Sequence, residues 1–371
     1  MGVPYFQIAN QVKKNKIFVF SSNFKLYGDM SKRVMNILKS AAPTVEIYSI
    51  DEAFLDLSHF SENVSHYAEN LVKQIYQWTG LPVSIGIAPT KTLAKAANFA
   101  AKKQKTSTNI CHLLDTQFQI EQLAQMQVKD IWGIGRRTSE KLNQIGIHTA
   151  LQLRNTRIEF ARRHFNICLV DTILELQGKG IKWLETESKP RKQIIVSRSF
   201  GKKVNELGDL KAALTDHICH AASKLRQQGS TTKTIFIFLK THSFKDHHGQ
   251  KSTDEHSITI PLETPTDNST ELISIALQQL NTWYRHDFFY KKIGIMLLDL
   301  KPKENLQYDL FSPHDYQRSQ KLMDTLDSIN SILGRGTLRY GIQIFKKTWS
   351  ARCTHRSQSY TTDWHELLCV S

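Results

Sequence analysis

The segment YSIDEAFLDLS, residues 48–58, sets two adjacent carboxylates, Asp51 and Glu52, inside an otherwise apolar run. The flanking stretches Val45–Ile50 and Ala53–Leu57 are rich in β-branched, aromatic and leucine residues and predict strands. Only two residues separate them, which predicts an antiparallel hairpin with both acids at its tip, although such loops favour Asn-Gly or Asp-Gly. Neighbouring side chains can converge at a hairpin tip but not within a strand. Converging carboxylates suit Mg²⁺, and a solvated turn is the alternative.

The composition narrows the class of protein. At 371 residues the chain is long enough for two or three domains, and 40% hydrophobic with 22% charged residues is typical of a globular protein. No apolar run approaches the length that crosses a bilayer, and the first residues, MGVPYFQIANQVKKNK, are polar where a signal peptide has its apolar stretch. The five cysteines are scattered and odd in number, which argues against a disulfide framework. We therefore expect a cytoplasmic protein with no membrane contact.

The charge balance indicates a polyanionic partner. The chain has 49 lysines and arginines against 34 acidic residues, and its pI is near 9.5. Between Val128 and Lys203 there are sixteen basic residues but only seven acids. A solvated surface is the ordinary explanation of a basic composition, but a concentration of charge beside a phosphate-binding motif favours nucleic acid.

Such a motif lies at residues 128–153, VKDIWGIGRRTSEKLNQIGIHTALQL. A G-I-G turn separates two short helical patterns and Gly146 stands where the second should end, which is typical of a helix-hairpin-helix. The glycines let the turn expose backbone N–H groups to a DNA phosphate, and the basic residues that follow add charge; an ordinary structural turn is the alternative. The predicted DNA-backbone contacts are Gly133, Ile134, Gly135, Arg136, Arg137 and Lys141.

The segments around the carboxylate hairpin predict an α/β domain. Asn23–Lys39 and Tyr67–Trp78 have helical periodicity, and Pro82–Ile87 predicts a strand. An alanine-rich helix, APTKTLAKAANFAAKK, is expected to begin near Pro89 or Thr90.

Three lysines of this last helix share one stripe. Lys91, Lys95 and Lys102 lie at i, i+4 and i+11, which at 3.6 residues per turn is one face. A line of basic residues beside a metal site suits a triphosphate. The alternative is a solvated face, which fits Lys91 and Lys95 better than Lys102.

The second half of the chain predicts a separate domain. A polar, proline-containing linker at Leu184–Lys192 precedes the order βαββαβ, which is typical of a ferredoxin-like domain. The expected elements are strands Gln193–Ser199, Thr234–Thr241, Ser257–Leu262 and Lys292–Leu300 and helices Leu207–Gln228 and Ser269–Arg285.

In this order the motifs resemble those of the Y-family translesion DNA polymerases, in particular the UmuC branch. The resemblance rests on SSNFKLYGDMSKRV, VEIYSIDEAFLDLS, APTKTLAKAANFAAKK, DIWGIGRRTSEKL and SRSFGKKV, and it covers nearly the whole chain. It implies an α/β multidomain fold with an incomplete palm and a helical thumb, a linker, a little finger and a C-terminal extension. The corresponding ranges are 1–115, 116–183, 184–192, 193–300 and 301–371.

The resemblance also implies a chemistry. Asp51 and Glu52 would hold two Mg²⁺ ions, Lys102 would contact the triphosphate, and the helix-hairpin-helix would grip the DNA backbone. The implied activity is error-prone translesion synthesis in the SOS response, in which deoxynucleoside triphosphates are added to a primer-template DNA. A UmuD′ dimer and RecA are the implied protein partners.

The N-terminus departs from the family pattern. Family members begin with a strand of the pattern D-x-N-x-F-Y, which supplies a third metal ligand, and small fingers follow. Here MGVPYFQI resembles the end of the fingers, so roughly fifty residues of the family layout have no counterpart. The expected result is an under-ligated metal site and little polymerase activity from this chain alone. Three explanations fit this departure: a misplaced start codon, a decayed gene, or a fragment that still binds DNA. The last of these gives the alternative function, a non-catalytic remnant that binds DNA and the sliding clamp.

A short peptide near the C-terminus predicts a further partner. QYDLF resembles the Q-x-x-L-F peptide by which bacterial polymerases bind the β sliding clamp, with Gln307 in a polar pocket and Leu310 and Phe311 in an apolar cleft. An ordinary loop anchor is the alternative. Beyond it, Tyr316–Leu333 predicts a helix, and the tail resembles the C-terminal extension of the UmuC branch.

Overall fold

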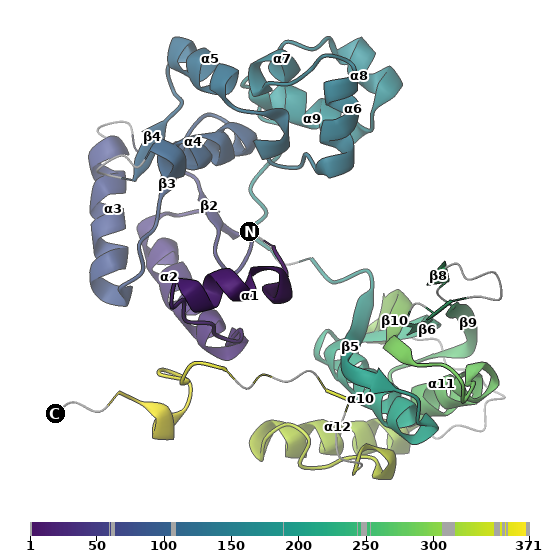
Figure 1. Cartoon of the computed structure of the whole chain (residues 1–371). Coiled ribbons are helices and arrows are strands. Elements are labelled where there is room, and N and C mark those ends of the chain that lie inside the picture. Colours follow the sequence, from purple (N-terminus) through teal and green to yellow (C-terminus); the bar gives the residue numbers. More distant parts are fainter. Residues whose placement is uncertain are drawn as a thin grey trace. The chain divides into compact units, whose positions relative to one another are not determined.

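The computed structural model forms two compact units (Figure 1). Unit 1 comprises Met1–Ser188 with His355–Ser371, and unit 2 comprises Lys189–Thr354. The residues that the structure describes are 2–58, 60, 64–104, 109–187, 189–242, 244–245, 251–252, 254–305, 316–344, 349–350, 353 and 355–368. No helix in these ranges is long and apolar enough to cross a membrane.

The first part of unit 1 is a mixed α/β arrangement. Its elements are α1 (Tyr5–Lys14), α2 (Phe24–Ala41), β1 (Val45–Ile47), β2 (Ala53–Leu55), α3 (Val64–Thr79), β3 (Ile85–Ile87), α4 (Lys91–Gln104) and β4 (Ile110–His112). The hairpin β1–β2 is antiparallel and β3–β4 is parallel. Strand β3 lies so close to α4 that a Cβ on Gly86 would stand 2.2 Å from the carbonyl oxygen of Ala94. The predicted helices and strands of this part are therefore confirmed, with strands shorter than expected.

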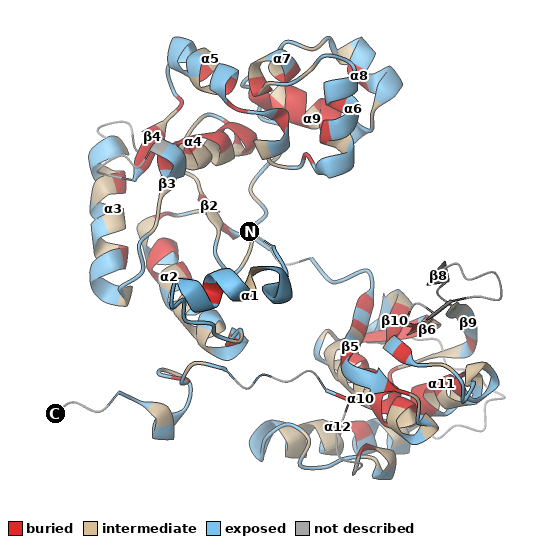
Figure 2. Cartoon of the chain, in the orientation of Figure 1, coloured by how far each residue is buried: buried red, intermediate tan, exposed pale blue. Residues whose placement is uncertain are grey.

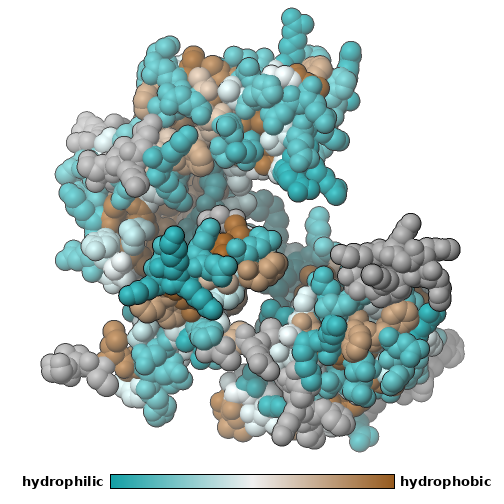
Figure 3. Space-filling view, viewed as in Figure 1, coloured by the Kyte–Doolittle hydropathy of each residue, from teal (hydrophilic) through white to brown (hydrophobic). Residues whose placement is uncertain are grey.

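The second part of unit 1 is helical. It contains α5 (Thr116–Gln125), the 3-10 turn η1 (Val128–Asp130), α6 (Arg136–Gln144), α7 (Ala150–Arg154), α8 (Ile158–His164) and α9 (Ile167–Leu176). These helices share one apolar core with α4, and Figure 2 shows buried residues concentrated on α4 and α9. The face seen in Figure 3 is mostly hydrophilic over the same helices.

Unit 2 confirms the predicted βαββαβ order. Its elements are β5 (Ile194–Val204), α10 (Leu207–Gln227), β6 (Ser230–Thr241), β9 (Glu255–Thr266), α11 (Ser269–Trp283) and β10 (Tyr290–Pro302), with a small hairpin of β7 (Phe244–Lys245) and β8 (Lys251–Ser252). The sheet order is β5-β10-β6-β9, with every neighbouring pair antiparallel. Each β-α-β crossover thus encloses one strand of the other, and both helices pack on the sheet in one core.

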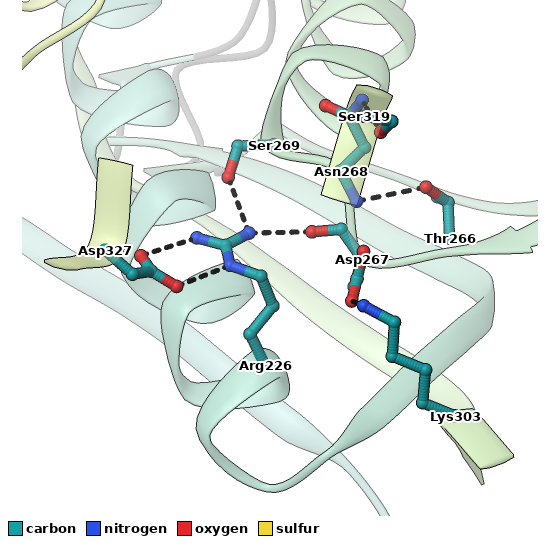
Figure 4. A network of polar contacts seen from close by, with 8 residues as sticks. All are labelled: Arg226, Thr266, Asp267, Asn268, Ser269, Lys303, Ser319 and Asp327. Atoms are coloured by element: carbon teal, nitrogen blue, oxygen red, sulfur yellow. Dashed lines mark hydrogen bonds and ion pairs between the residues drawn. The ribbon is translucent and has the colours of Figure 1, made fainter. Parts of the chain in front are cut away.

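The C-terminal region begins on unit 2. Helix α12 (Tyr316–Ile332) has the predicted extent to within one residue, and it is followed by the 3-10 turns η3 (Gly341–Ile344) and η4 (Trp364–Glu366). Arg226, at the end of α10, holds α12 through two bonds to the Asp327 carboxylate, at 2.6 and 2.9 Å (Figure 4). The same guanidinium donates to the Asp267 carbonyl and the Ser269 hydroxyl. Only 6% of the Arg226 side chain is exposed, so α12 packs on unit 2 as part of its fold.

A histidine on α10 makes the stability of unit 2 dependent on pH. Burial, assisted by the nearby charges of Arg335 and Lys224, lowers the pKa of His220 from 6.5 to about 4. The unfolded chain therefore binds a proton at higher pH than the folded chain does, and the free energy of unfolding should decrease as the pH falls from about 6.5 to about 4. Urea unfolding across this range tests the prediction. The variant His220→Gln should flatten the decrease, and an unchanged pH profile would contradict it.

Candidate active site and nucleic-acid interface

The two predicted carboxylates lie on the loop between β1 and β2. The strands pair from Val45 with Leu55 to Ile47 with Ala53, so five residues, 48–52, form the loop. The expected two-residue tip is therefore wrong. The strands end early because the Glu52 carbonyl accepts hydrogen bonds from the N–H groups of both Tyr48 and Ser49, at 3.1 and 3.0 Å, which closes a wider turn.

The two acids have different environments within this loop. Asp51 is exposed, and one of its carboxylate oxygens accepts a hydrogen bond of 2.6 Å from the Ser49 hydroxyl. The Glu52 side chain is 29% exposed, and its Oε1 lies 2.5 Å from Nζ of Lys95 on α4. Asp51 thus offers oxygen atoms to solvent, whereas Glu52 is already partly neutralised.

The lysines at the start of α4 are structural partners of acids. Nζ of Lys91 lies 2.5 Å from Oε2 of Glu46, whose side chain is 10% exposed. The same carboxylate oxygen accepts the backbone N–H of Glu185 at 2.8 Å. The alternative of a solvated face therefore does not hold for Lys91 and Lys95, since both are held by carboxylates from the hairpin. Lys102, in the last turn of α4, is exposed.

An aromatic cluster joins the carboxylate loop to the hairpin of the helical part. The rings of Tyr48, Phe54 and Trp132 lie 5.4–5.8 Å apart, and Nε1 of Trp132 donates a hydrogen bond of 3.1 Å to the Tyr48 hydroxyl. Lys91 lies over Phe54 and Lys182 over Trp132, at 4.8 and 4.4 Å from the ring centres. Trp132 immediately precedes Gly133, so the two predicted functional loops are in contact through side chains.

A buried glutamate fixes the start of α4. Glu175 on α9 is fully buried, and its Oε2 accepts both the N–H and the hydroxyl of Thr92 at 2.9 Å. Its Oε1 accepts the N–H groups of Ile181 and Lys182 at 3.1 and 2.9 Å. One carboxylate thus ties together three segments. Neither Glu175 nor Glu46 was predicted from the sequence, because a single acid in an apolar run carries no spacing signal. Strand alternation with Val45 and Ile47 would even place Glu46 on the solvent side, whereas its side chain is buried.

The predicted helix-hairpin-helix is present as a turn and a short helix. Gly133 has φ +86° and Gly146 has φ +84°, backbone conformations that favour glycine. Gly135 is the N-cap of α6, and a Cβ there would meet nothing within 4 Å. Ile134 is buried in the core of the helices rather than exposed to a ligand. The turn therefore presents the open backbone at the start of α6 that a phosphate contact requires.

The basic residues of α6 lie around this turn and beside a hollow. Arg136, with 87% of its side chain exposed, forms a loose ion pair with Glu140 at 3.5 Å, and Arg137 is exposed. Lys141 lines a hollow of about 350 Å³. The other residues that line the hollow are Thr138, Arg163, His164, Phe165 and Asn166.

The remaining predicted sites have mixed outcomes. In the described part of the chain, no three His, Cys, Asp or Glu side chains lie together in a way that could hold a metal ion. Asp51 and Glu52 therefore stand as a pair of carboxylates. The predicted clamp-binding residues Gln307, Leu310 and Phe311 lie outside the described residues.

The fold matches that of a known class. A solved Y-family DNA polymerase chimera superimposes with a TM-score of 0.53 at 18% sequence identity, over 75% of this chain and 77% of the chimera. The predicted α/β multidomain fold with a helix-hairpin-helix is thereby confirmed.

Sequence relatives define the family. The model of the impB/mucB/samB family matches residues 1–98, that of its C-terminal domain 191–310 and that of its helix-hairpin-helix motif 119–147, while a domain of unknown function matches 320–370. Protein UmuC of Salmonella typhimurium is 37% identical over 100% of this chain and 88% of its own length. Protein MucB of Escherichia coli is 34% identical over 99% and 87%. The chain therefore belongs to the impB/mucB/samB family, the UmuC branch of the Y-family DNA polymerases.

Proposed function

We propose that this chain takes part in translesion DNA synthesis, with the β1–β2 loop as its metal site and the helix-hairpin-helix as its grip on DNA. The observation that supports this most is the aromatic cluster of Tyr48, Phe54 and Trp132. Within one unit it joins the loop that carries the two carboxylates to the helix-hairpin-helix turn proposed to bind phosphate. Relatives named UmuC and DNA polymerase IV support the reaction, and the family supports a need for a divalent metal. The SOS response is the proposed setting.

The residues of the loop fit a hard cation. Asp51 and Glu52 offer carboxylate oxygens, the donors that Mg²⁺ prefers. We propose that the ion pair with Lys95 neutralises Glu52 until the cation binds. The Ser49 hydroxyl would hold Asp51 in place by donating a hydrogen bond to its carboxylate. When bound, Mg²⁺ would activate the primer 3′-hydroxyl and offset the charge of the transferring phosphoryl group. Lys102 is the proposed contact for the triphosphate.

Primer extension with Mg²⁺ and the four deoxynucleoside triphosphates tests this function. Asp51→Asn and Glu52→Gln should each reduce extension by about a hundredfold or more, because they remove metal ligands without changing side-chain size. Glu121→Ala, an exposed acid on α5, is the matched control and should have no effect. Measurable extension that is equal in all variants would refute the assignment of the two carboxylates.

A second function, DNA binding without synthesis, is favoured by one observation. The described residues supply two carboxylates rather than three, and Glu52 is already paired with Lys95. Under this alternative the unmodified chain would bind primer-template DNA normally and extend nothing. Measurement of binding in parallel with extension therefore separates the two functions.

DNA binding should depend steeply on salt through the hollow beside α6. The slope of log K against log salt is negative for DNA binding. We expect Lys141→Ala combined with Arg163→Ala to reduce its magnitude by about two, since each cation that contacts a phosphate releases about one counterion. Lys13→Ala with Lys14→Ala removes the same charge from exposed positions on α1 and is the control. An equal change in both double variants would indicate a general charge effect and contradict a local phosphate contact.

We further propose the partners that the family suggests: the β sliding clamp through Gln307, Leu310 and Phe311, a UmuD′ dimer, and RecA. Capture of the chain on immobilised clamp tests the first of these. Leu310→Ala with Phe311→Ala should abolish capture if the peptide binds in an apolar cleft. Retention of the double variant would assign the peptide to an ordinary loop.

A further inference from the structure

The C-terminal tail contacts both units at defined places. Its first part is held on unit 2 by Arg226 and Asp327, and by Trp349, which is 4% exposed and lies 6.2 Å, centre to centre, from the ring of Phe200. The carbonyl of Trp349 also accepts the N–H of Gly201 at 2.9 Å. Six residues after Trp349, at His355, the chain is again part of unit 1. The tail therefore has one anchor in each unit.

The second anchor is a set of hydrogen bonds to the segment that precedes α2. The N–H of Ser21 donates to the His355 carbonyl at 2.8 Å, and Ser21 forms a parallel bridge with Arg356. The side-chain amide of Asn23 donates to the carbonyls of Ser357 and Gln358 at 3.1 and 3.4 Å. Asn23 is 1% exposed, which means that the tail buries it.

The docked peptide also has its own internal structure. The N–H of Ser359 donates to the Glu366 carboxylate at 2.5 Å, and the Ser359 carbonyl accepts the N–H groups of Thr362 and Asp363. Ser359 is 3% exposed. Farther along α2, the Thr361 hydroxyl and, after it, the Arg33 guanidinium hold the pKa of Asp29 below its ordinary value. The tail is thus an internally hydrogen-bonded peptide docked at the N-cap of α2.

We propose that residues 355–366, which we name the latch segment, bind the start of α2 as an intramolecular latch. This assigns a role to the region matched by the domain of unknown function, and it does not depend on the proposed function. When the latch is closed, the two units are connected twice, by the linker at 184–192 and by the chain that leads from unit 2 to the latch segment. A loop closed by a short connector restricts the separations that the two units can reach.

Asn23 allows a test that spares the fold. Its Oδ1 accepts the N–H of Leu26 as the N-cap of α2, and its amide group donates to the latch segment. Asn23→Asp keeps the cap, since Asp is an equally good N-cap, but replaces the donor by an oxygen that faces two carbonyls. Asn166→Asp is the matched control, because Asn166 caps α9 through the same type of bond to Leu169.

Hydrogen exchange of the full-length chain is the first measurement. In Asn23→Asp we expect the amide of Ser21 and those of the latch segment to exchange about tenfold faster or more, while α9 and the centre of α2 stay unchanged. Glu366→Ala should produce the same effect from the other side of the contact. Asn166→Asp should leave the latch segment protected. Protection of Ser21 that is unchanged in both latch variants would overturn the proposal.

Trypsin cleavage and X-ray scattering complete the test. Cleavage after Arg356 should be slow in the unmodified chain and fast in Asn23→Asp, because proteases require an extended, undocked substrate. The radius of gyration should increase in the same variant if the latch restricts the two units. If Asn23→Asp exchanges faster but keeps the same radius of gyration, the latch segment docks as proposed but does not restrain the two units.

Discussion

Glu175→Ala is expected to lower the free energy of unfolding of unit 1 by about 2–4 kcal/mol, because four donors, two of them in buried hydrogen bonds, lose their acceptor at once. The loss should be greatest where α4 begins, since Thr92 contributes two of those donors. Hydrogen exchange of α4 and α9 during urea unfolding measures it.

The isosteric variant separates charge from size at this position. Glu175→Gln keeps one acceptor oxygen but turns an amide toward the N–H groups on the other side, so we expect an intermediate destabilisation. Glu121→Ala, at an exposed position, should change the stability by less than about 0.5 kcal/mol. A loss for Glu175→Ala as small as that of this control would contradict the role of Glu175 as the tie between α4 and α9.

Arg226→Ala is expected to release α12 and to destabilise unit 2 by about 3–5 kcal/mol. The substitution leaves the Asp327 carboxylate without its bidentate partner and removes the donor from the Asp267 carbonyl and the Ser269 hydroxyl (Figure 4). Proteolysis within α12 and urea unfolding of unit 2 measure the two effects.

Conservative variants test the geometry of this contact. Arg226→Lys keeps the charge but cannot form two parallel bonds, so α12 should still be released in part. Asp327→Asn keeps the size of the partner and loses its charge, and it should have a smaller effect than Arg226→Ala. A rate of proteolysis within α12 that is the same in all three variants and the unmodified chain would refute the anchor.

The sequence predicted well whatever depends on neighbouring residues. The helical periodicity of residues 23–39, the βαββαβ order of unit 2 and the G-I-G turn were all readable from local pattern, and all are confirmed. Each rests on side-chain period or on glycine conformations that adjacent residues determine.

Contacts between distant residues could not be predicted in the same way. A solvated face was the alternative for Lys91, but its partner Glu46 is 45 positions away, and the donors to Glu175 lie on two segments, the start of α4 and residues 181–182. The order of strands in the sheet of unit 2 likewise depends on tertiary packing rather than on period. The roles of Asp51, Glu52, Lys102 and the clamp peptide remain predictions that the experiments above address.

The contact between Tyr48 and Trp132 would link cation binding at the carboxylate loop to phosphate binding at the proposed DNA-binding turn. Trp132 is covalently next to Gly133 and donates to the hydroxyl of Tyr48, which is three residues from Asp51. If a phosphate bound at the turn shifts Trp132, it also changes the free energy of cation binding at the loop, and the cation must change DNA affinity by the same factor. The phosphate and the cation would then influence each other without contact, because both would depend on the packing of the same three aromatic rings, Tyr48, Phe54 and Trp132.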